Sequence, residues 1–449
     1  MSPRRIIAVF HLYQSMGAKG AFLRPGGQVA LRKLGNAQNA LGMLYMERAA
    51  AVDLAQGEAA VAREKDNWQR SCTRFTQSAQ TFGRVADAVN VALVNCNLGK
   101  LMRVRCASAV LRGQVAGGPT RQERMLHDKA IEYYQAAMES LQRRGTHPGV
   151  WDIVSVELAG AYLAFASLLQ DNLGTVDRSV PDLLAKALRL YTEEHSLAYK
   201  GSGGGLADDG HGETRRSEAV ANKIVEVHHR LAKYHADACS GDGGGGGSGV
   251  QNQSCKLADL HYQRAIKMYT AISGATAAKN CFQVHLEAAS MHLAANEIAG
   301  RYRHLAVSLD LLLDSAPALS RLQVEVEGTN AKPGRRGTAT GITGTAGSAA
   351  CSIVVGDIGE EIQGLTDDTA MLLRELHRLL GLCLRGLLKE THKRGQGGGN
   401  SSKKRADRLR HLFEMYLRHM PAPAIVDAAN LTALPLVIDT LQAMQQATV

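Results

Sequence analysis

The sequence predicts an all-α protein built from antiparallel helix pairs stacked in a superhelical array, with a helical cap at the C-terminal end. Three observations carry this prediction. A short motif of Leu, a small residue and a large residue recurs four times. Each copy is followed by a full or partial match to a second pattern of Ala and an aromatic residue. Runs of β-branched residues are scarce and aromatic residues make up only 5% of the chain, so sheets are not expected.

The recurrent motif places a small residue directly after Leu and a large residue three places further on. This is the pattern of a tetratricopeptide first helix, in which the small residue lets the second helix approach and the large one fills the space beside it. Its Leu positions are 57, 60 and 73 residues apart, against about 34 in a standard unit. Longer helices and Gly-rich loops at 200–205 and 240–249 would absorb the excess. The copies are Leu41, Gly42 and Tyr45; Leu98, Gly99 and Met102; Leu158, Ala159 and Tyr162; Leu231, Ala232 and His235.

A second-helix pattern follows the first: Ala, an aromatic residue four places later and Ala three places after that. Ala130, Tyr134 and Ala137 match it in full. The other copies match in part, through Ala187 with Tyr191, Ala265 with Tyr269, and Ser71, Phe75 and Ser78 in the first repeat. The sequence therefore predicts a tetratricopeptide-like array.

Composition divides the chain into four segments. We expect an N-terminal segment at 1–35, the helical repeat array with Gly-rich loop insertions at 36–320, a flexible linker at 321–356 and a C-terminal helical region at 357–449. In that last region Met371–Glu390 is Leu-rich nearly all round and should be mostly buried. The amphipathic segment Lys404–Met420 should pack on it across a loop at 395–402.

Charge and cysteine usage bound the classes of function. Between Thr391 and Met420 there are eight Lys and Arg against two acidic residues, so most of the net charge of +10 lies there. No uninterrupted apolar run approaches the roughly 20 residues of a membrane span, so no membrane partner is predicted. The eight cysteines form no C-x-x-C pair, which predicts neither a zinc site nor a disulfide framework and favours a reducing compartment, nucleus or cytoplasm.

The residues that could carry chemistry do not form a catalytic signature. His228 and His235 share a helix face, and His261 or Cys239 could complete a zinc site, but His235 occupies the large-residue position of a repeat, so packing is the favoured interpretation. No nucleophile motif and no phosphate-binding glycine loop is present. The sequence predicts no enzyme, no cofactor and no metal.

The inner surface of the array is the predicted binding site, because first helices line the concave face of such stacks. Counting from the Leu positions places Asn39, Lys100, Arg103, His229 and Lys233 on that face. Cationic and amide side chains together could hold an acidic peptide segment of another protein. The alternative is that these lysines and arginines form an ordinary solvated surface without a binding role.

A basic cluster near the C-terminus has three interpretations. Lys393 and Arg394, followed by Lys403, Lys404 and Arg405, resemble a two-part nuclear import signal with a slightly short spacer. The cluster could also be a solubilising loop. Direct nucleic-acid binding through residues 393–410 is the alternative function; it is not favoured, because no aromatic residue interrupts the basic run and no DNA-reading motif is present.

Several segments resemble the tetratricopeptide region of the erythroid differentiation-related factor family. They are Asn39–Met46, Asn95–Arg103, His147–Asp152 followed by Glu157, His228–Ala232 followed by Tyr234, and Leu257–Tyr262. The likeness covers about residues 36–275 and fades beyond Met291. It implies a scaffold or adaptor that acts through protein contacts in the nucleus, alternatively the cytoplasm, in transcription regulation. Family members are much longer, so the resemblance also implies a C-terminal portion of such a protein.

Overall fold

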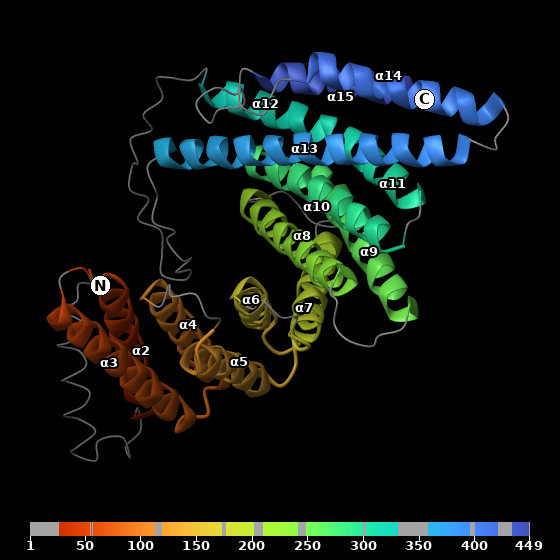
Figure 1. Cartoon of the computed structure of the whole chain (residues 1–449). Coiled ribbons are helices and arrows are strands. Elements are labelled where there is room, and N and C mark those ends of the chain that lie inside the picture. The colour runs from red at the N-terminus through yellow and green to blue at the C-terminus, as the bar shows by residue number, and fades with distance from the viewer. Residues whose placement is uncertain are drawn as a thin grey trace. The chain divides into compact units, whose positions relative to one another are not determined.

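The structure is a computed structural model that describes residues 27–112 except 54 and 56, 119–172, 177–201, 210–240, 248–299, 302–330, 358–395, 400–420 and 433–448. Over these residues the regular structure is entirely helical, as predicted. The chain divides into two compact units, residues 1–227 and 228–449, and the boundary falls inside one long helix (Figure 1).

The N-terminal unit is a series of helical hairpins. Helix α2 pairs with α3, α4 with α5 and α6 with α7 (Figure 1). A reciprocal capping box starts α5, in which the Thr120 hydroxyl accepts from the Glu123 N–H and the Glu123 carboxylate accepts from the Thr120 N–H. The helices are α2 Gly27–Ala50, α3 Glu58–Gly83, α4 Ala88–Arg112, α5 Arg121–Leu141, α6 Pro148–Asn172, α7 Val180–Gly201 and α8 Gly210–Ser240.

Small residues bring the two helices of each hairpin into close contact, as the sequence predicted. A Cβ atom on Gly42 would lie 2.6 Å from the ring of Phe75, and one on Gly99 would lie 2.7 Å from the ring of Tyr134. Ser71 strengthens the first contact by donating its hydroxyl to the Gly42 carbonyl at 2.8 Å. Any larger residue at either glycine would collide with a ring that has no room to move.

The second-helix pattern also occupies the helix interfaces. Phe75 and Tyr134 are fully buried, and Ala187 and Ala265 are inaccessible to solvent. Ala159 and Ala232, the small residues of the third and fourth copies, are likewise buried. The tetratricopeptide-like packing is therefore confirmed at each of the four repeats.

The C-terminal unit adds a hairpin that the motif search missed. Its helices α10 and α11 are joined by a bond from the Ser308 hydroxyl to the Ala289 carbonyl at 2.9 Å, the same type of contact that Ser71 makes with Gly42. Phe282 of α10 and Leu312 of α11 are fully buried. The unit holds the end of α8, α9 Ser248–Ala271, α10 Ala275–Ala299, α11 Tyr302–Leu313, α12 Ala316–Asn330, α13 Ile358–Gly395, α14 Asn400–His419 and α15 Leu434–Thr448.

Helices α13 and α15 pack on the α10–α12 layer, and α14 packs on α13 and α15. Gly386 of α13 lets the helix approach Leu305 of α11, where an added Cβ would lie 3.2 Å from the leucine side chain. Tyr416 of α14 hydrogen-bonds to His377 of α13. Leu412 is also buried on this side of α14, so the expected packing of the amphipathic segment on α13 is confirmed.

Several boundaries differ from those expected. Helix α2 begins at Gly27, inside the segment assigned to the N-terminal piece, and α12 continues to Asn330, inside the expected linker; residues 331–357 lie outside the described residues. Helix α13 reaches Gly395 and α14 begins at Asn400, so the described residues of the expected loop 395–402 are helical. Helix α13 is also not apolar all round, because Arg374 and Arg378 lie on an exposed face.

One described helix has the length and hydropathy of a membrane span. It is the segment Pro148–Asp171 of α6, and 56% of its most apolar window is buried inside the protein. The same helix carries Glu157, which is bound to two cations of the neighbouring helix. These contacts are those of a core helix in a helical stack.

Candidate functional site

Polar side chains link successive first helices in the N-terminal unit. The Asn97 amide of α4 donates to the Asn39 side-chain oxygen of α2 at 3.0 Å. One repeat further, Glu157 of α6 binds two cations of α4, with Lys100 Nζ at 2.9 Å and an Arg103 guanidinium nitrogen at 3.1 Å. The first helices therefore share one row of polar groups, defined here as the first-helix polar row.

Burial makes the Glu157 site electrostatically strong. Tyr134 is fully buried inside its hairpin and donates its hydroxyl to the Glu157 carboxylate at 3.4 Å. Burial opposes the charge of Arg103, but the neighbouring Tyr134 and Glu157 outweigh it and raise the pKa of the guanidinium. Burial, followed by the Glu157 charge, raises the pKa of the Cys96 thiol to about 12, so this cysteine stays protonated and unreactive.

The C-terminal unit has a polar contact of the same kind. The His229 ring of α8 lies 2.7 Å from the Glu287 carboxylate of α10 through Nε2. Gln283 donates a further hydrogen bond to this carboxylate at 2.8 Å. Burial opposes the charge on Glu287, but His229, Gln283 and the exposed Lys233 nearby lower its pKa below the usual value.

Four of the five residues predicted to line a groove have a side-chain partner: Asn39 contacts Asn97, Lys100 and Arg103 contact Glu157, and His229 contacts Glu287. Asn39, Lys100 and Arg103 lie in the N-terminal unit, whereas His229 and Lys233 lie in the C-terminal unit. The acidic partners Glu157 and Glu287 were missed. Glu157 could have been found from the sequence, because it and Asn97 each directly precede the Leu of their repeat. Comparing that position across the copies would have identified both residues.

Replacing Glu157 by Gln is expected to lower the stability of the N-terminal unit by about 1–3 kcal/mol, because two partly buried cations lose their counter-charge. Thermal unfolding monitored by circular dichroism measures the loss. Glu193→Gln is the matched control, since its pair with Arg189 joins side chains that are 62% and 74% exposed and should contribute less than about 1 kcal/mol. Equal shifts for the two variants would contradict the expected role of Glu157.

A histidine cluster joins α8 to α9. The Nδ1 atoms of His228 and His261 lie 2.9 Å apart, and the His235 ring stacks on His261 with centroids 6.0 Å apart. These are the residues considered for a zinc site, together with Cys239. Among the described residues, no three or more His, Cys, Asp or Glu side chains are arranged to hold a metal ion.

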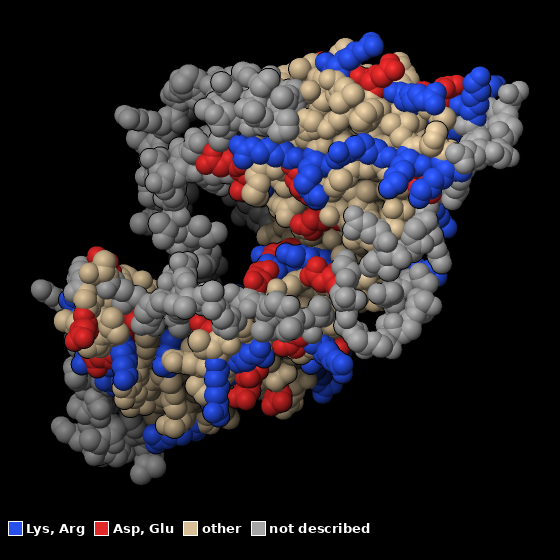
Figure 2. Space-filling view, viewed as in Figure 1, with Lys and Arg blue, Asp and Glu red and all other residues tan. Residues whose placement is uncertain are grey.

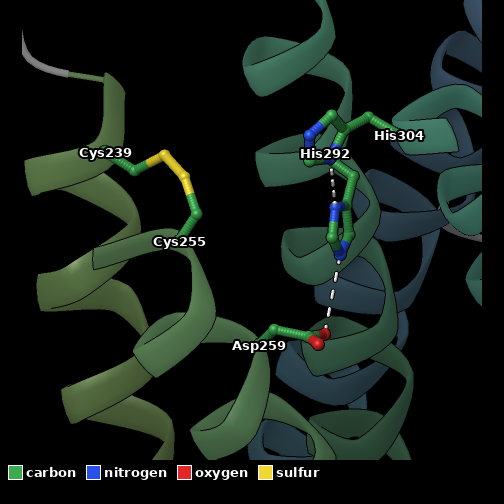
Figure 3. The surroundings of a disulfide bond; sticks show 5 residues. All are labelled: Cys239, Cys255, Asp259, His292 and His304. Atoms are coloured by element: carbon green, nitrogen blue, oxygen red, sulfur yellow. Dashed lines mark hydrogen bonds and ion pairs between the residues drawn. A yellow bond between two sulfur atoms is a disulfide. The ribbon is translucent and has the colours of Figure 1, made fainter. Parts of the chain in front are cut away.

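Cys239 is bonded to Cys255, which corrects the prediction that no disulfide forms (Figure 3). The two residues are 16 positions apart in the sequence, one near the end of α8 and the other in the first half of α9, and their Cα atoms are 5.5 Å apart. The disulfide was not predicted because a spacing of 16 residues carries no motif.

A second pair of histidines lies nearby. On α10, His292 lies 3.1 Å from His304 through their Nδ1 atoms and 3.5 Å from the Asp259 carboxylate (Figure 3).

The basic cluster lies on two helices. Lys393 is exposed near the end of α13 and pairs with Glu390 at 3.0 Å. Lys403, Lys404 and Arg405 are exposed in the first turns of α14. The side chain of Arg394 lies outside the described residues. The cluster is therefore largely helical, in contrast to the flexible loop expected.

Comparison with known proteins supports the repeat assignment. The family model "Erythroid differentiation-related factor 1-like, TPR repeats" matches residues 30–198 and 214–448. The expectation that the likeness fades beyond Met291 is therefore wrong. The family match extends through the C-terminal helices.

Curated relatives agree with this family. The chain is 28% identical to erythroid differentiation-related factor 1 of Homo sapiens over 311 residues and 30% identical to the Mus musculus protein over 314 residues. Both matches cover 66% of this chain but only 23% of the relative, so the chain spans about a quarter of the length of these proteins. A solved circular tandem repeat protein aligns with a TM-score of 0.29 and 12% identity, which is too low to bear on the fold.

A family with tetratricopeptide repeats suggests a protein-interaction scaffold. The family model matches most of the chain, and the hairpin packing agrees with it, so the chain can be assigned to a family as well as to a fold class. The chain belongs to the erythroid differentiation-related factor 1-like family of tetratricopeptide-repeat proteins.

Proposed function

We propose that this protein is a scaffold or adaptor that binds acidic segments of other proteins along its first helices, in the nucleus, in the regulation of transcription. The observation that carries the proposal is the first-helix polar row around Glu157, where two cations from one repeat bind a carboxylate from the next. A site that holds one carboxylate in this way is chemically suited to a carboxylate from another chain.

Glu157 then acts as an internal competitor for that ligand. Lys100 and Arg103 remain partly exposed, with side chains 27% and 32% accessible, so a ligand carboxylate can reach them from solvent. Binding would require the ligand to share or displace the Glu157 contacts. This competition gives the proposal a distinctive consequence, because removing Glu157 and removing the cations should affect binding in opposite directions.

The test is proximity labelling in cells with the full chain and three variants. Lys100→Gln with Arg103→Gln should reduce the labelling of acidic-segment partners about tenfold or more, the effect of losing about 1.4 kcal/mol or more of binding free energy. Glu157→Gln should increase that labelling. Gln is preferred to Glu at the two cationic positions because a new acidic residue beside Glu157 would add repulsion within the fold.

The control variant carries the same charge change on an outer helix. Arg121 and Lys129 are exposed on α5, and their replacement by Gln should leave the set of labelled neighbours unchanged. If Lys100→Gln with Arg103→Gln also leaves the neighbours unchanged while the protein remains folded, the first helices are not where partners bind.

The nuclear site of action is supported by the exposed basic residues at the end of α13 and the start of α14. Imaging of a fluorescent fusion separates this part of the proposal from the binding surface. Lys403→Ala, Lys404→Ala and Arg405→Ala together should shift the fusion from the nucleus to the cytoplasm, with retention of nuclear fluorescence as the contrary outcome.

A further inference from the structure

Exposed cations form a row along one side of α13. They recur at intervals of four or seven residues, which places them on one helix face. Leu376, Leu380 and Leu384 on the opposite side are buried, so the row faces solvent. We define the α13 basic row as Arg374, Arg378, Arg385, Lys389 and Lys393, all of them exposed.

The length of this row is set by the helix. Its first and last members, Arg374 and Lys393, are 19 positions apart, which corresponds to about 28 Å at the rise of an α-helix. Figure 2 shows the lysines and arginines as a continuous line over α13. Only Met371 and Leu382 interrupt this face as large exposed apolar side chains.

The neighbouring helix extends the positive surface. Helix α14 packs against α13 and carries six lysines and arginines against two acidic residues. Residues 371–393 of α13 carry five against two. Residues 371–393 and helix α14 together carry a net charge of +7, whereas residues 358–370 at the start of α13 carry four acidic residues.

The acidic residues on this surface do not cancel its charge. Glu375 binds Arg378 through two hydrogen bonds of 2.6 and 2.7 Å, and Glu390 binds Lys393. Both contacts are made within one helix and at the surface, where ion pairs contribute little and exchange readily with other anions. The surface therefore keeps a net positive potential.

From this charge distribution we infer that the α13–α14 surface binds the phosphate backbone of duplex DNA without reading its sequence. The row of about 28 Å approaches the length of one duplex turn, about 34 Å. A duplex presents dense and regularly spaced negative charge along its backbones, which a row of guanidinium and ammonium groups of similar length complements. This activity goes beyond protein scaffolding and uses a separate surface.

The apolar content of the surface argues against two other partners. Membrane-surface helices present a broad apolar face to the lipid, whereas here the apolar face of α13 is buried in the protein. Single strands need exposed aromatic side chains for base stacking, whereas Tyr416 of α14 is buried and Phe413 stacks on it. Duplex phosphates need neither feature.

Fluorescence anisotropy with the full chain and a labelled duplex of about 30 base pairs and mixed sequence tests the inference. We expect binding at about 50 mM salt that weakens about 1,000-fold at about 200 mM, the result of roughly six phosphate contacts. Replacing Arg374, Arg378, Arg385 and Lys389 by Gln should weaken binding at least tenfold. It should also make the slope of log K against log salt shallower by about 3–4.

The matched control removes four exposed cations from the N-terminal unit. Replacing Lys65, Arg121, Lys129 and Arg143 by Gln gives the same change in net charge. Loss of affinity as large as that of the α13 variant would show that only total charge matters and would overturn the inference. Gln keeps a helix propensity close to that of Arg and Lys, so α13 should remain helical.

A second variant and a competition experiment complete the test. If the α13 variant melts at a lower temperature, Lys403→Gln, Lys404→Gln and Arg408→Gln on α14 provide a second test with the same expected direction. Equal competition by polyglutamate or by anionic vesicles, or no duplex binding at about 50 mM salt, would assign the surface to a different role. Partner labelling through Lys100 and Arg103 is independent of these results.

Discussion

Replacing Phe75 by Ala is expected to lower the free energy of unfolding of the N-terminal unit by about 3–5 kcal/mol. The ring is fully buried and fits against Gly42, where the absence of a Cβ atom leaves room for it. Its removal leaves a cavity that a rigid hairpin cannot close, because Ser71 fixes the distance between α2 and α3 by its bond to the Gly42 carbonyl.

Intrinsic tryptophan fluorescence measures this loss selectively. Both tryptophans of the chain, Trp68 and Trp151, lie in the N-terminal unit, so their emission during urea unfolding reports that unit. Val61→Ala on the same helix is the control, because this side chain is 40% exposed, and its effect should stay within about 1 kcal/mol. A similar small effect for Phe75→Ala would show that the α2–α3 hairpin does not depend on this contact.

The hairpin packing could be predicted from the sequence because it depends on a local pattern. Gly42 and Gly99 are recognisable since the aromatic partner of each, Phe75 or Tyr134, recurs at a fixed place in the next helix. The α10–α11 hairpin escaped the same search because Ala288 stands before the small Ala289 where the earlier copies have Leu, and Leu312, four places after Ser308, stands where they have an aromatic residue. An aliphatic residue at that place leaves no distinctive pattern.

The partners of the candidate site could not be predicted in the same way. The sequence placed Lys100 and Arg103 on the first helix, but their partner Glu157 is more than 50 residues away. The disulfide of Cys239 depends on how two helices meet at their ends. The exposed face of α13 was also missed, because a Leu-rich helix with cations at intervals of four resembles a buried helix until its neighbours are known.

Acidification is expected to loosen the contact between α8 and α9. His228 and His261 are held neutral, because burial lowers the pKa of each imidazole to about 4, with smaller effects from Arg264 on both and from His228 and His235 on His261. The unfolded chain has histidine pKa values near 6.5. Between these values the unfolded state binds more protons, so stability is complete above about pH 7 and falls as the pH decreases toward 4.

The expected loss at about pH 5 is about 1–2 kcal/mol for each of the two histidines, after allowing for their partial contact with solvent. Hydrogen–deuterium exchange of α9, expressed as protection factors to remove the intrinsic effect of pH, should show protection decreasing about tenfold or more between about pH 7.5 and 5. His261→Gln removes one titrating ring of the pair while keeping a polar side chain, and should flatten this dependence. His411→Gln, at an exposed position of α14, should leave it unchanged. Protection of α9 that does not change over this pH range would contradict the prediction, because protonation of His228 and His261 would then cost no stability.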